Sequence, residues 1–275
     1  MRIGVIYLIP VPIGNLGDIT LRALDTLKKV SLIACEDTRK TAFLLSQYEI
    51  PVPQLISFHK FNERKREQAL FEHLERGEDL AVVSDAGSPA ISDPAQRLVA
   101  EAVKRNLPVQ ALPGATAFVP ALSISGFSTS AFQFIGFLPA KNKDREAVLM
   151  QIAAYPYPSI VYESVHHLKA CLEDMARHFP SRRITIAREI SKLHEECIRG
   201  TIETILADYE ITEKGEFVIV IDGPDEVEIE FPNALAAQMI AESGDKKSRE
   251  LAAELAQRFG ISKKRAYQYV LEQRK

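Results

Sequence analysis

The chain has few cysteines and lacks the motifs of several common enzyme classes. Its three cysteines, Cys35, Cys171 and Cys197, lie far apart among 275 residues, without the spacing of a metal site and without the even number that suits a disulfide framework. This usage is typical of a reducing compartment, so we expect a cytoplasmic protein. The sequence also has no Walker phosphate loop and no Gly-x-Ser-x-Gly elbow, which argues against P-loop nucleotide hydrolysis and against serine hydrolase chemistry.

Charge is absent from residues 106–140, which raises the question of a membrane segment. A bilayer span needs about 20 predominantly apolar residues, but prolines, glycines and a cluster of Ser and Thr interrupt this stretch. We therefore expect no membrane partner and interpret the segment as a buried domain junction that also contributes to a subunit interface. The apolar N-terminus is broken by Pro10 and Pro12 and predicts a first strand, not an export signal.

The net charge of −3 hides an uneven distribution. Residues 246–275 carry nine Lys and Arg against three Glu, a net charge of +6, which leaves 25 basic and 34 acidic residues, or −9, for the remainder. Apolar spacing predicts two short helices over residues 245–260 and 261–275, similar to a small helix-turn-helix unit. Their positive charge suits a phosphate backbone. A solvated helical tail is the alternative.

Strands and helices alternate through the first half, which predicts an α/β fold with a largely parallel sheet. One buried strand, residues 81–83, runs into Ser84-Asp85-Ala86-Gly87-Ser88-Pro89. This turn places a hydroxyl and a carboxylate at the carboxyl end of a strand, where small ligands bind in open α/β sheets. Ser-Asp-x-Gly is also an ordinary turn, so the motif by itself does not establish a site.

The second half of the chain also places polar clusters at strand ends. These clusters are residues 162–167, 188–196 and 215–216, and together with the first half they suggest a cleft between two domains. No familiar catalytic constellation appears, and His166, His167 and His194 lack metal-ligand spacing, so we expect no metal site. The aromatic strand at residues 132–139 is predicted to belong to the core.

Six segments occur in the order found in one protein family. They are residues 11–19 (VPIGNLGDI), 36–39 (EDTR), 84–89 (SDAGSP), 113–115 (PGA), 134–139 (FIGFLP) and 188–196 (REISKLHEE). Over about residues 5 to 225 the chain resembles the small-subunit ribosomal RNA methyltransferase I group of the tetrapyrrole methylase superfamily. The resemblance implies two α/β domains with S-adenosylmethionine bound in the cleft between them, a homodimer, and methylation of a cytidine ribose 2′-hydroxyl in the decoding region of 16S ribosomal RNA.

With this resemblance, the sequence predicts four regions. They are an N-terminal α/β domain (1–117), a C-terminal α/β domain (118–225), a linker (226–245) and a basic all-helical domain (246–275). Two positions depart from the family pattern. Ser88 replaces the usual Thr before proline and keeps the hydroxyl, whereas His167 replaces an arginine and removes its charge.

The resemblance assigns roles to individual residues. The residues expected to hold the cofactor are Ile13, Ser84, Asp85, Ala86, Gly87, Ser88, Thr116, Ala117 and Tyr162. A carboxylate such as Asp85 can accept hydrogen bonds from the cofactor's ribose hydroxyls or ammonium group, and Gly87 lets the backbone approach closely.

A ribose hydroxyl is a weak acid, so a nearby base would help its attack. The residues considered for this role are Glu163, Glu189, Lys192 and His194, and the sequence does not choose among them. The residues expected to contact RNA are Arg39, Arg188, Lys263, Lys264 and Arg265. Two other functions stay open: methylation of a tetrapyrrole, and ribosome-associated RNA binding without chemistry.

Overall fold

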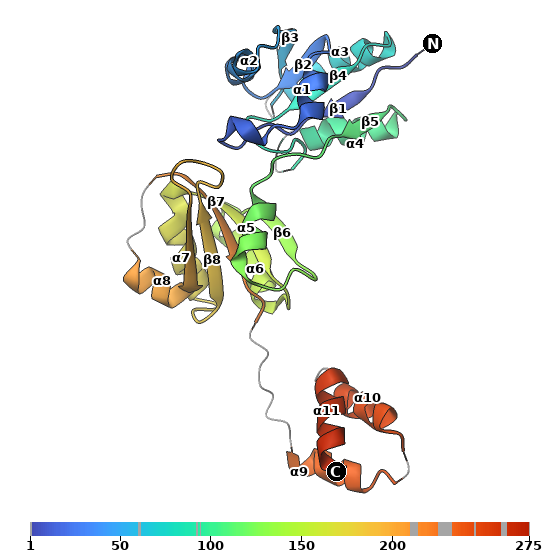
Figure 1. The fold of residues 1–275 in the computed structure, drawn as a ribbon, viewed down its shortest axis with the longest axis vertical. Coiled ribbons are helices and arrows are strands. Elements are labelled where there is room, and N and C mark those ends of the chain that lie inside the picture. Colours follow the sequence, from blue (N-terminus) through green and yellow to red (C-terminus); the bar gives the residue numbers. More distant parts are fainter. Residues whose placement is uncertain are drawn as a thin grey trace. The chain divides into compact units, whose positions relative to one another are not determined.

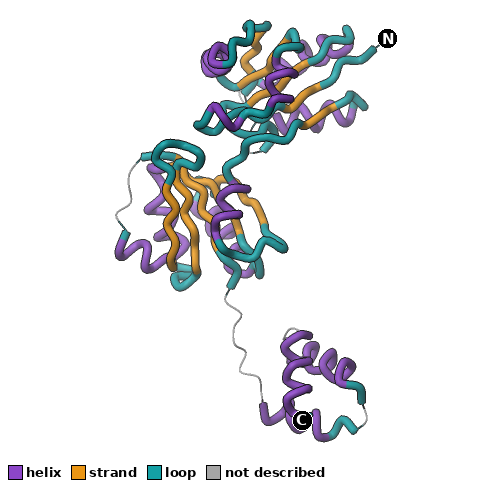
Figure 2. The backbone as a smooth tube through the Cα atoms, viewed as in Figure 1, coloured by secondary structure: helices purple, strands orange, loops and turns teal. Residues whose placement is uncertain are grey.

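The computed structural model describes residues 2–59, 62–91, 93, 95–209, 214–224, 233–244, 246–259 and 263–274. The chain forms two compact units, Met1–Gly223 and Pro224–Lys275 (Figure 1). The first unit contains two five-stranded sheets and the second contains helices (Figure 2). Among the described residues, no helix is long and apolar enough to cross a bilayer.

The first sheet is entirely parallel and has the order β3-β2-β4-β1-β5. Its strands are β1 (Ile6–Leu8), β2 (Leu32–Cys35), β3 (Gln54–Ser57), β4 (Leu80–Val83) and β5 (Val109–Ala111). The helices between them are α1 (Leu21–Leu27), α2 (Thr38–Gln47), α3 (Glu63–Glu75) and α4 (Ala95–Lys104), and the 3-10 helix η1 spans Leu16–Asp18. All residues of β2 and β4 are buried, because helices cover both faces of the sheet and each face has its own apolar cluster.

The strand order positions a ligand crevice. The chain leaves β1 toward β2 and β3 on one side, returns to β4 between β2 and β1, and then crosses to β5 on the other side. Connections that diverge from neighbouring strands β1 and β4 open a crevice beyond their carboxyl ends. The segment after β1 and the turn at Ser84–Ser88 after β4 both lie there.

The second sheet is mixed and has the order β6-β7-β10-β8-β9, with only β6 and β7 parallel. Its strands are β6 (Gln133–Phe137), β7 (Ser159–Ser164), β8 (Arg183–Arg188), β9 (Glu196–Thr201) and β10 (Glu216–Ile221). Its helices are α5 (Phe118–Ser125), α6 (Asn142–Ala154), α7 (Leu168–Ala176) and α8 (Ile202–Asp208), with the 3-10 helix η2 at Val165–His167. The two-domain α/β prediction is thus confirmed, although strand β9 was not among the predicted elements.

The second unit comprises α9 (Asn233–Ala241), α10 (Ser248–Phe259) and α11 (Lys263–Gln273). Leu251, Leu255 and Val270 are buried in its core, which agrees with the apolar spacing from which the sequence predicted two helices. The core also includes Ile240 of α9, so a helix occupies part of the segment expected to be a linker. The turn expected between the two helices falls at residues 260–262, which lie outside the described residues.

Candidate functional site

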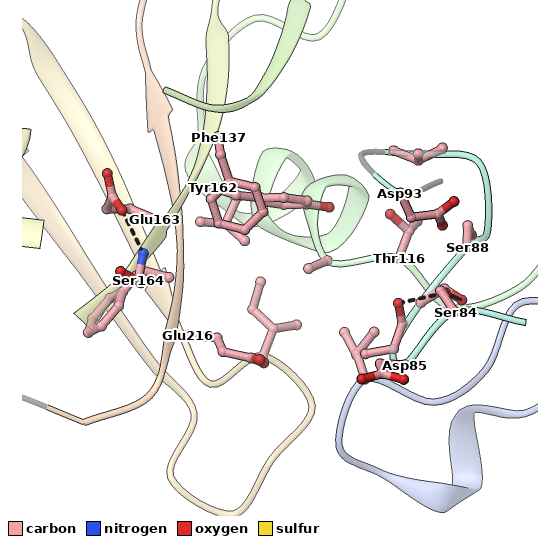
Figure 3. Close-up of a pocket in the computed structure, with 18 of the residues that line it drawn as sticks. Ser84, Asp85, Ser88, Asp93, Thr116, Phe137, Tyr162, Glu163, Ser164 and Glu216 are labelled. Atoms are coloured by element: carbon pink, nitrogen blue, oxygen red, sulfur yellow. Dashed lines mark hydrogen bonds between the residues drawn. The ribbon is translucent and has the colours of Figure 1, made fainter. Parts of the chain in front are cut away.

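A cavity of about 410 Å³ lies between the two sheets of the first unit (Figure 3). One wall comes from the turn after β4 and from residues 116–117, and the other comes from β7, β10 and the loop after β8. All nine residues predicted to hold the cofactor line it: Ile13, Ser84, Asp85, Ala86, Gly87, Ser88, Thr116, Ala117 and Tyr162. The fold therefore brings residues that are far apart in the sequence, such as Ile13 and Tyr162, into one site.

The turn after β4 is held in place by its own hydrogen bonds and by those to two other segments. The buried hydroxyl of Ser84 donates to the carbonyl of Gly87 at 3.2 Å. Gly87 has φ +74°, which a residue with a side chain adopts only with strain, and its N–H and C=O both bond to Val11 at 3.0 Å. Ser88 Oγ donates to the carbonyl of Ala115 at 3.0 Å. These bonds tie the loops after β1, β4 and β5 together into a single wall.

Carboxylates are concentrated on this wall. Asp85 accepts a hydrogen bond from Lys40 Nζ at 2.7 Å and another from the backbone N–H of Asp37 at 3.1 Å. Glu36 Oε1 in turn accepts from the backbone N–H of Asp85 at 3.2 Å. Burial raises the pKa of Glu36, and the nearby charges of Asp85 and Asp93 raise it further, while burial also raises the pKa of Asp93. The wall is therefore negative and suited to a cationic ligand.

Aromatic side chains form the opposite wall. The register between β6 and β7 shifts between Phe134 and Gly136, and Gly136 has φ +75°. This irregularity turns Phe137 outward, so that it is 59% exposed and meets Tyr162 edge-on with ring centroids 5.6 Å apart. The prediction that the aromatics of residues 132–139 belong to the core is therefore wrong for Phe137, and it is also wrong for Phe132, which is exposed. Phe134 is half-buried against a core cluster. Burial raises the pKa of Tyr162, so its hydroxyl stays neutral.

The loop after β8 contributes a charged network. Lys192 Nζ donates to Glu189 Oε1 and to Glu216 Oε2, each at 2.9 Å. Burial lowers the pKa of Lys192, but the two carboxylates outweigh burial and raise it above its usual range. Glu189 has φ +51° and also accepts the backbone N–H of Glu216 at 2.9 Å, so its strained conformation is fixed by β10.

The same loop touches the first sheet's side of the cavity. A Cβ added to Gly14 would lie 2.4 Å from Cγ of Lys192, which shows that the lysine stem covers this glycine. The Ser191 hydroxyl donates to the Asp18 carboxylate. The loop after β8 therefore closes one side of the cavity.

The four residues considered as a base occupy different places. Lys192 and Glu163 are among the lining residues, and Glu189 lies one hydrogen bond behind Lys192. Glu163 is buried beside Cys171 of α7, and its carboxylate accepts the backbone N–H of Ser164 at 2.8 Å. Because alternate side chains of β7 point to opposite faces, the Glu163 carboxylate lies on the face away from Tyr162 (Figure 3).

Two further residues named from the sequence lie away from the cavity. His194 is exposed and does not line it. His167, at the position where the family usually has an arginine, is exposed at the end of η2 and does not line it either.

The arginines expected to contact RNA also lie outside this cavity. Arg39 is exposed on α2 and forms a two-point ion pair with Asp37. Arg188 is largely buried, donates from Nε to the carbonyl of Lys214 at 2.8 Å and pairs with Glu196 at 3.2 Å. Arg188 is therefore engaged in holding its own loop.

The remaining residues predicted to bind RNA belong to α11. The side chain of Lys263 is exposed. The side chains of Lys264 and Arg265 lie outside the described residues.

Several lining residues were not predicted as ligand contacts. They are Glu36, Ile91, Asp93, Phe137, Ser164, Ile190, Glu216, Phe217 and Val218. Glu36 and Glu216 were visible as polar residues next to predicted strands, and that position was the available signal. The apolar residues among them gave no signal, since their pattern is also that of a core. Within the described part of the chain, no group of three or more His, Cys, Asp or Glu is placed to hold a metal ion.

The sequence pattern described as tetrapyrrole (corrin/porphyrin) methylases matches residues 5–206, which cover both sheets apart from β10. The chain belongs to this family. Among curated relatives, ribosomal RNA small subunit methyltransferase I of Synechocystis sp. is 47% identical over 80% of this chain and 79% of its own length. The protein of the same name from Escherichia coli O157:H7 is 40% identical over 98% of this chain and 96% of its own.

Solved structures of tetrapyrrole methylases share the fold. Uroporphyrin-III C-methyl transferase from Thermus thermophilus, complexed with S-adenyl homocysteine, aligns with a TM-score of 0.57 at 16% identity, over 79% of this chain and 97% of that one. The cobalt precorrin-4 methyltransferase CbiF aligns with a TM-score of 0.57 at 14% identity, over 79% and 94%. At such identities the likeness concerns the fold alone.

The cofactor of this methylase is S-adenosylmethionine, as predicted, and the cavity fits it. Its volume lies within the usual range for small-molecule sites. Ile13, Ala86 and Phe137 offer apolar surface for a base and a methionine stem, while Asp85 and Glu36 offer carboxylates for hydroxyl and ammonium groups. A Cβ at Gly87 would meet Ile13 at 3.4 Å and fill part of this cradle.

Proposed function

We propose that this methylase transfers the methyl group of S-adenosylmethionine to the 2′-hydroxyl of a cytidine ribose in the decoding region of 16S ribosomal RNA. The observation that carries the proposal is the similarity to the Synechocystis and Escherichia coli proteins, both of which are named for small-subunit ribosomal RNA. The second of these alignments spans 98% of the chain, so it extends into the basic segment at residues 246–275.

The cavity supports the reaction mainly by positioning. The bound sulfonium supplies an activated methyl group, so the new O–CH₃ bond forms as the S–CH₃ bond breaks, and the hydroxyl proton must leave. Holding donor and acceptor in line between the Ser84–Ser88 turn and Tyr162 removes much of the entropic barrier.

The charged network at the loop after β8 is suited to stabilising the ribose oxygen as this oxygen loses its proton. The raised pKa of Lys192 keeps its amine protonated at neutral pH, so we assign it the role of a cation that stabilises the developing negative charge. Burial raises the pKa of Glu189, but hydrogen bonds from Lys192 and the Glu216 backbone outweigh burial and lower it. Glu189 is thus ionised, and from behind Lys192 it holds this cation in place. The carboxylate of this network that lines the cavity is that of Glu216.

The proposal includes a homodimer in the cytoplasm. Its support is the uncharged segment 106–140, within which α5 leaves Val119 and Ile124 partly exposed. Exposed apolar side chains on one helix are suited to a subunit interface.

A methyl-transfer assay with three acceptors tests the proposed function. Purified small ribosomal subunits, naked 16S RNA and a uroporphyrin are offered in parallel with radiolabelled S-adenosylmethionine. We expect label in RNA and none in the tetrapyrrole. Label in the tetrapyrrole alone would contradict the proposal and favour tetrapyrrole methylation. RNA binding without any methyl transfer would contradict it and favour a non-catalytic RNA-binding protein.

A further inference from the structure

A second cavity lies next to the cofactor cavity and shares Ser84 and Asp85 with it. Its volume is about 540 Å³, enough for a nucleotide. It is lined by the loop after β1 and by the first half of α2, through Val11, Pro12, Asp37, Arg39, Lys40, Thr41, Phe43 and Leu44. A ligand bound here would therefore touch the wall that holds the methyl donor.

The face of α2 toward this cavity combines a cation with an aromatic ring. Arg39 and Phe43 are four residues apart, so they lie on the same side of the helix. The side chain of Arg39 is 89% exposed and Phe43 is 66% exposed. A single exposed phenylalanine is common on protein surfaces, but a guanidinium and a ring beside a cavity form the pairing that holds bases and phosphates of single-stranded nucleic acid.

The cations of this cavity are positioned in advance. Asp37 accepts hydrogen bonds from Nε and Nη2 of Arg39, at 3.1 and 2.8 Å, which orients the guanidinium plane. Nη1 has no hydrogen-bond partner among the residues that the structure describes, so it is available to a phosphate oxygen. Lys40 pairs with Asp85. Cations in the first turn of a helix oppose its dipole, so Arg39 and Lys40 are poorly explained by helix stability.

We propose that this second cavity binds one nucleotide of the RNA next to the methylated residue, with its base stacked on Phe43 and its phosphate at Arg39. The inference rests on the proposed function, because it takes RNA as the acceptor. The shared wall at Ser84 and Asp85 then sets the distance between the anchored nucleotide and the methyl donor.

Substitutions at Phe43 test this subsite in the full chain. Affinity for a single-stranded RNA oligonucleotide with the 16S decoding-region sequence is measured by fluorescence anisotropy, and affinity for S-adenosylmethionine is measured by calorimetry. Phe43→Ala should weaken RNA binding about tenfold, whereas Phe43→Tyr should restore it, because stacking needs only the ring. The matched control is Leu21→Ala, which removes a side chain that is 80% exposed and does not line this cavity. S-adenosylmethionine affinity should stay unchanged in all three variants.

The outcomes separate this inference from the proposed function. Unchanged RNA affinity in Phe43→Ala, or an equal loss in Leu21→Ala, would overturn the subsite even if methyl transfer to RNA occurs. A change in oligomeric state that accounts for the loss would also overturn it, in favour of a protein interface. RNA binding that depends on Phe43 without methyl transfer would support the subsite and contradict the proposed function. A wild-type chain that binds no RNA would contradict both.

Discussion

Asp85 is the residue at which the two cavities meet, and its carboxylate already has two donors, Lys40 and the backbone of Asp37. The turn Ser-Asp-x-Gly after a buried strand marked it as a polar residue at a strand end, and the resemblance to the methyltransferase family assigned its role toward the cofactor. Its contact with Lys40 could not be predicted, since the two residues lie 45 positions apart on different elements. Local patterns identify residues at strand ends, whereas the pairing of strand ends depends on the order of strands in the sheet.

Replacement of Asp85 tests its role in holding the methyl donor. Asp85→Ala should weaken S-adenosylmethionine binding tenfold or more, because a charge-assisted hydrogen bond contributes about 1.5–3 kcal/mol. Calorimetry measures the affinity, and Asp25→Ala, at an exposed position of α1, is the control. Wild-type affinity in Asp85→Ala would remove this residue from the site.

Glu36 should make the protein less stable at neutral pH. Its folded-state pKa is raised by burial and by neighbouring carboxylates, so its ionised form is disfavoured in the folded chain. Glu36→Gln should therefore raise the melting temperature at pH 7.5 by about 1–4 °C. The gain should shrink as the pH falls through the raised pKa, since wild-type Glu36 is then protonated and neutral as well.

The same substitution should weaken binding of the cationic methyl donor. Thermal unfolding and calorimetry across pH check both effects, with the exposed Glu75→Gln as control. A variant that is less stable at pH 7.5 than the wild type would show that the Glu36 charge is favourable in the folded state, contrary to this account.

At the scale of elements, the parallel sheet could be predicted because its central strands β2 and β4 are continuous apolar runs that are buried on both faces. Strand β9 could not, because it is an edge strand of half-buried residues with the sequence Glu-Cys-Ile-Arg-Gly-Thr. The exposure of Phe137 could not be predicted either. Its exposure follows from a register shift at Gly136, and apolar periodicity cannot reveal such a shift.

The turn after β4 depends on a glycine with positive φ. Gly87→Ala should cost about 1–2 kcal/mol in the free energy of unfolding and should also lower S-adenosylmethionine affinity, because the new methyl group enters the cradle. Gly126→Ala is a matched control, since Gly126 has φ +79° and an added Cβ meets nothing within 4 Å. Urea unfolding should show similar losses in both variants, with affinity reduced only in Gly87→Ala. Equal affinities would mean that the turn does not contact the donor.

At the scale of the whole molecule, charge is distributed unevenly: residues 246–275 carry a net charge of +6 and residues 1–245 a net charge of −9. This distribution was visible in the sequence, and the buried Leu251 and Val270 agree with the apolar spacing that predicted the two C-terminal helices. Helix α9 was not predicted, because the acidic residues before it, Asp225 to Glu230, suggested a linker throughout. Its Ala236 and Ile240 become informative only once α10 and α11 are seen to cover them.

The basic segment, residues 246–275, should contribute to the salt dependence of RNA binding. Changing Lys263, Lys264 and Arg265 together to Gln should make the slope of log K against log salt shallower by about 2, because each lost phosphate contact removes about 0.7 on a single strand. Anisotropy titrations at several salt concentrations measure the slope. The control changes the exposed Lys28 and Lys29 to Gln. Identical slopes in wild type and the triple variant would leave the tail as a solvated helical unit.

The central claim is that the cavity between the two sheets directs a methyl group to a ribose oxygen of RNA. The most direct measurement is nucleoside analysis by mass spectrometry of 16S RNA after reaction of small subunits with deuterated S-adenosylmethionine. We predict one labelled nucleoside, 2′-O-methylcytidine, and a lower yield of it with the Asp85→Ala variant at the same subsaturating donor concentration. Label on a base carbon or nitrogen, or on no nucleoside at all, would contradict the account.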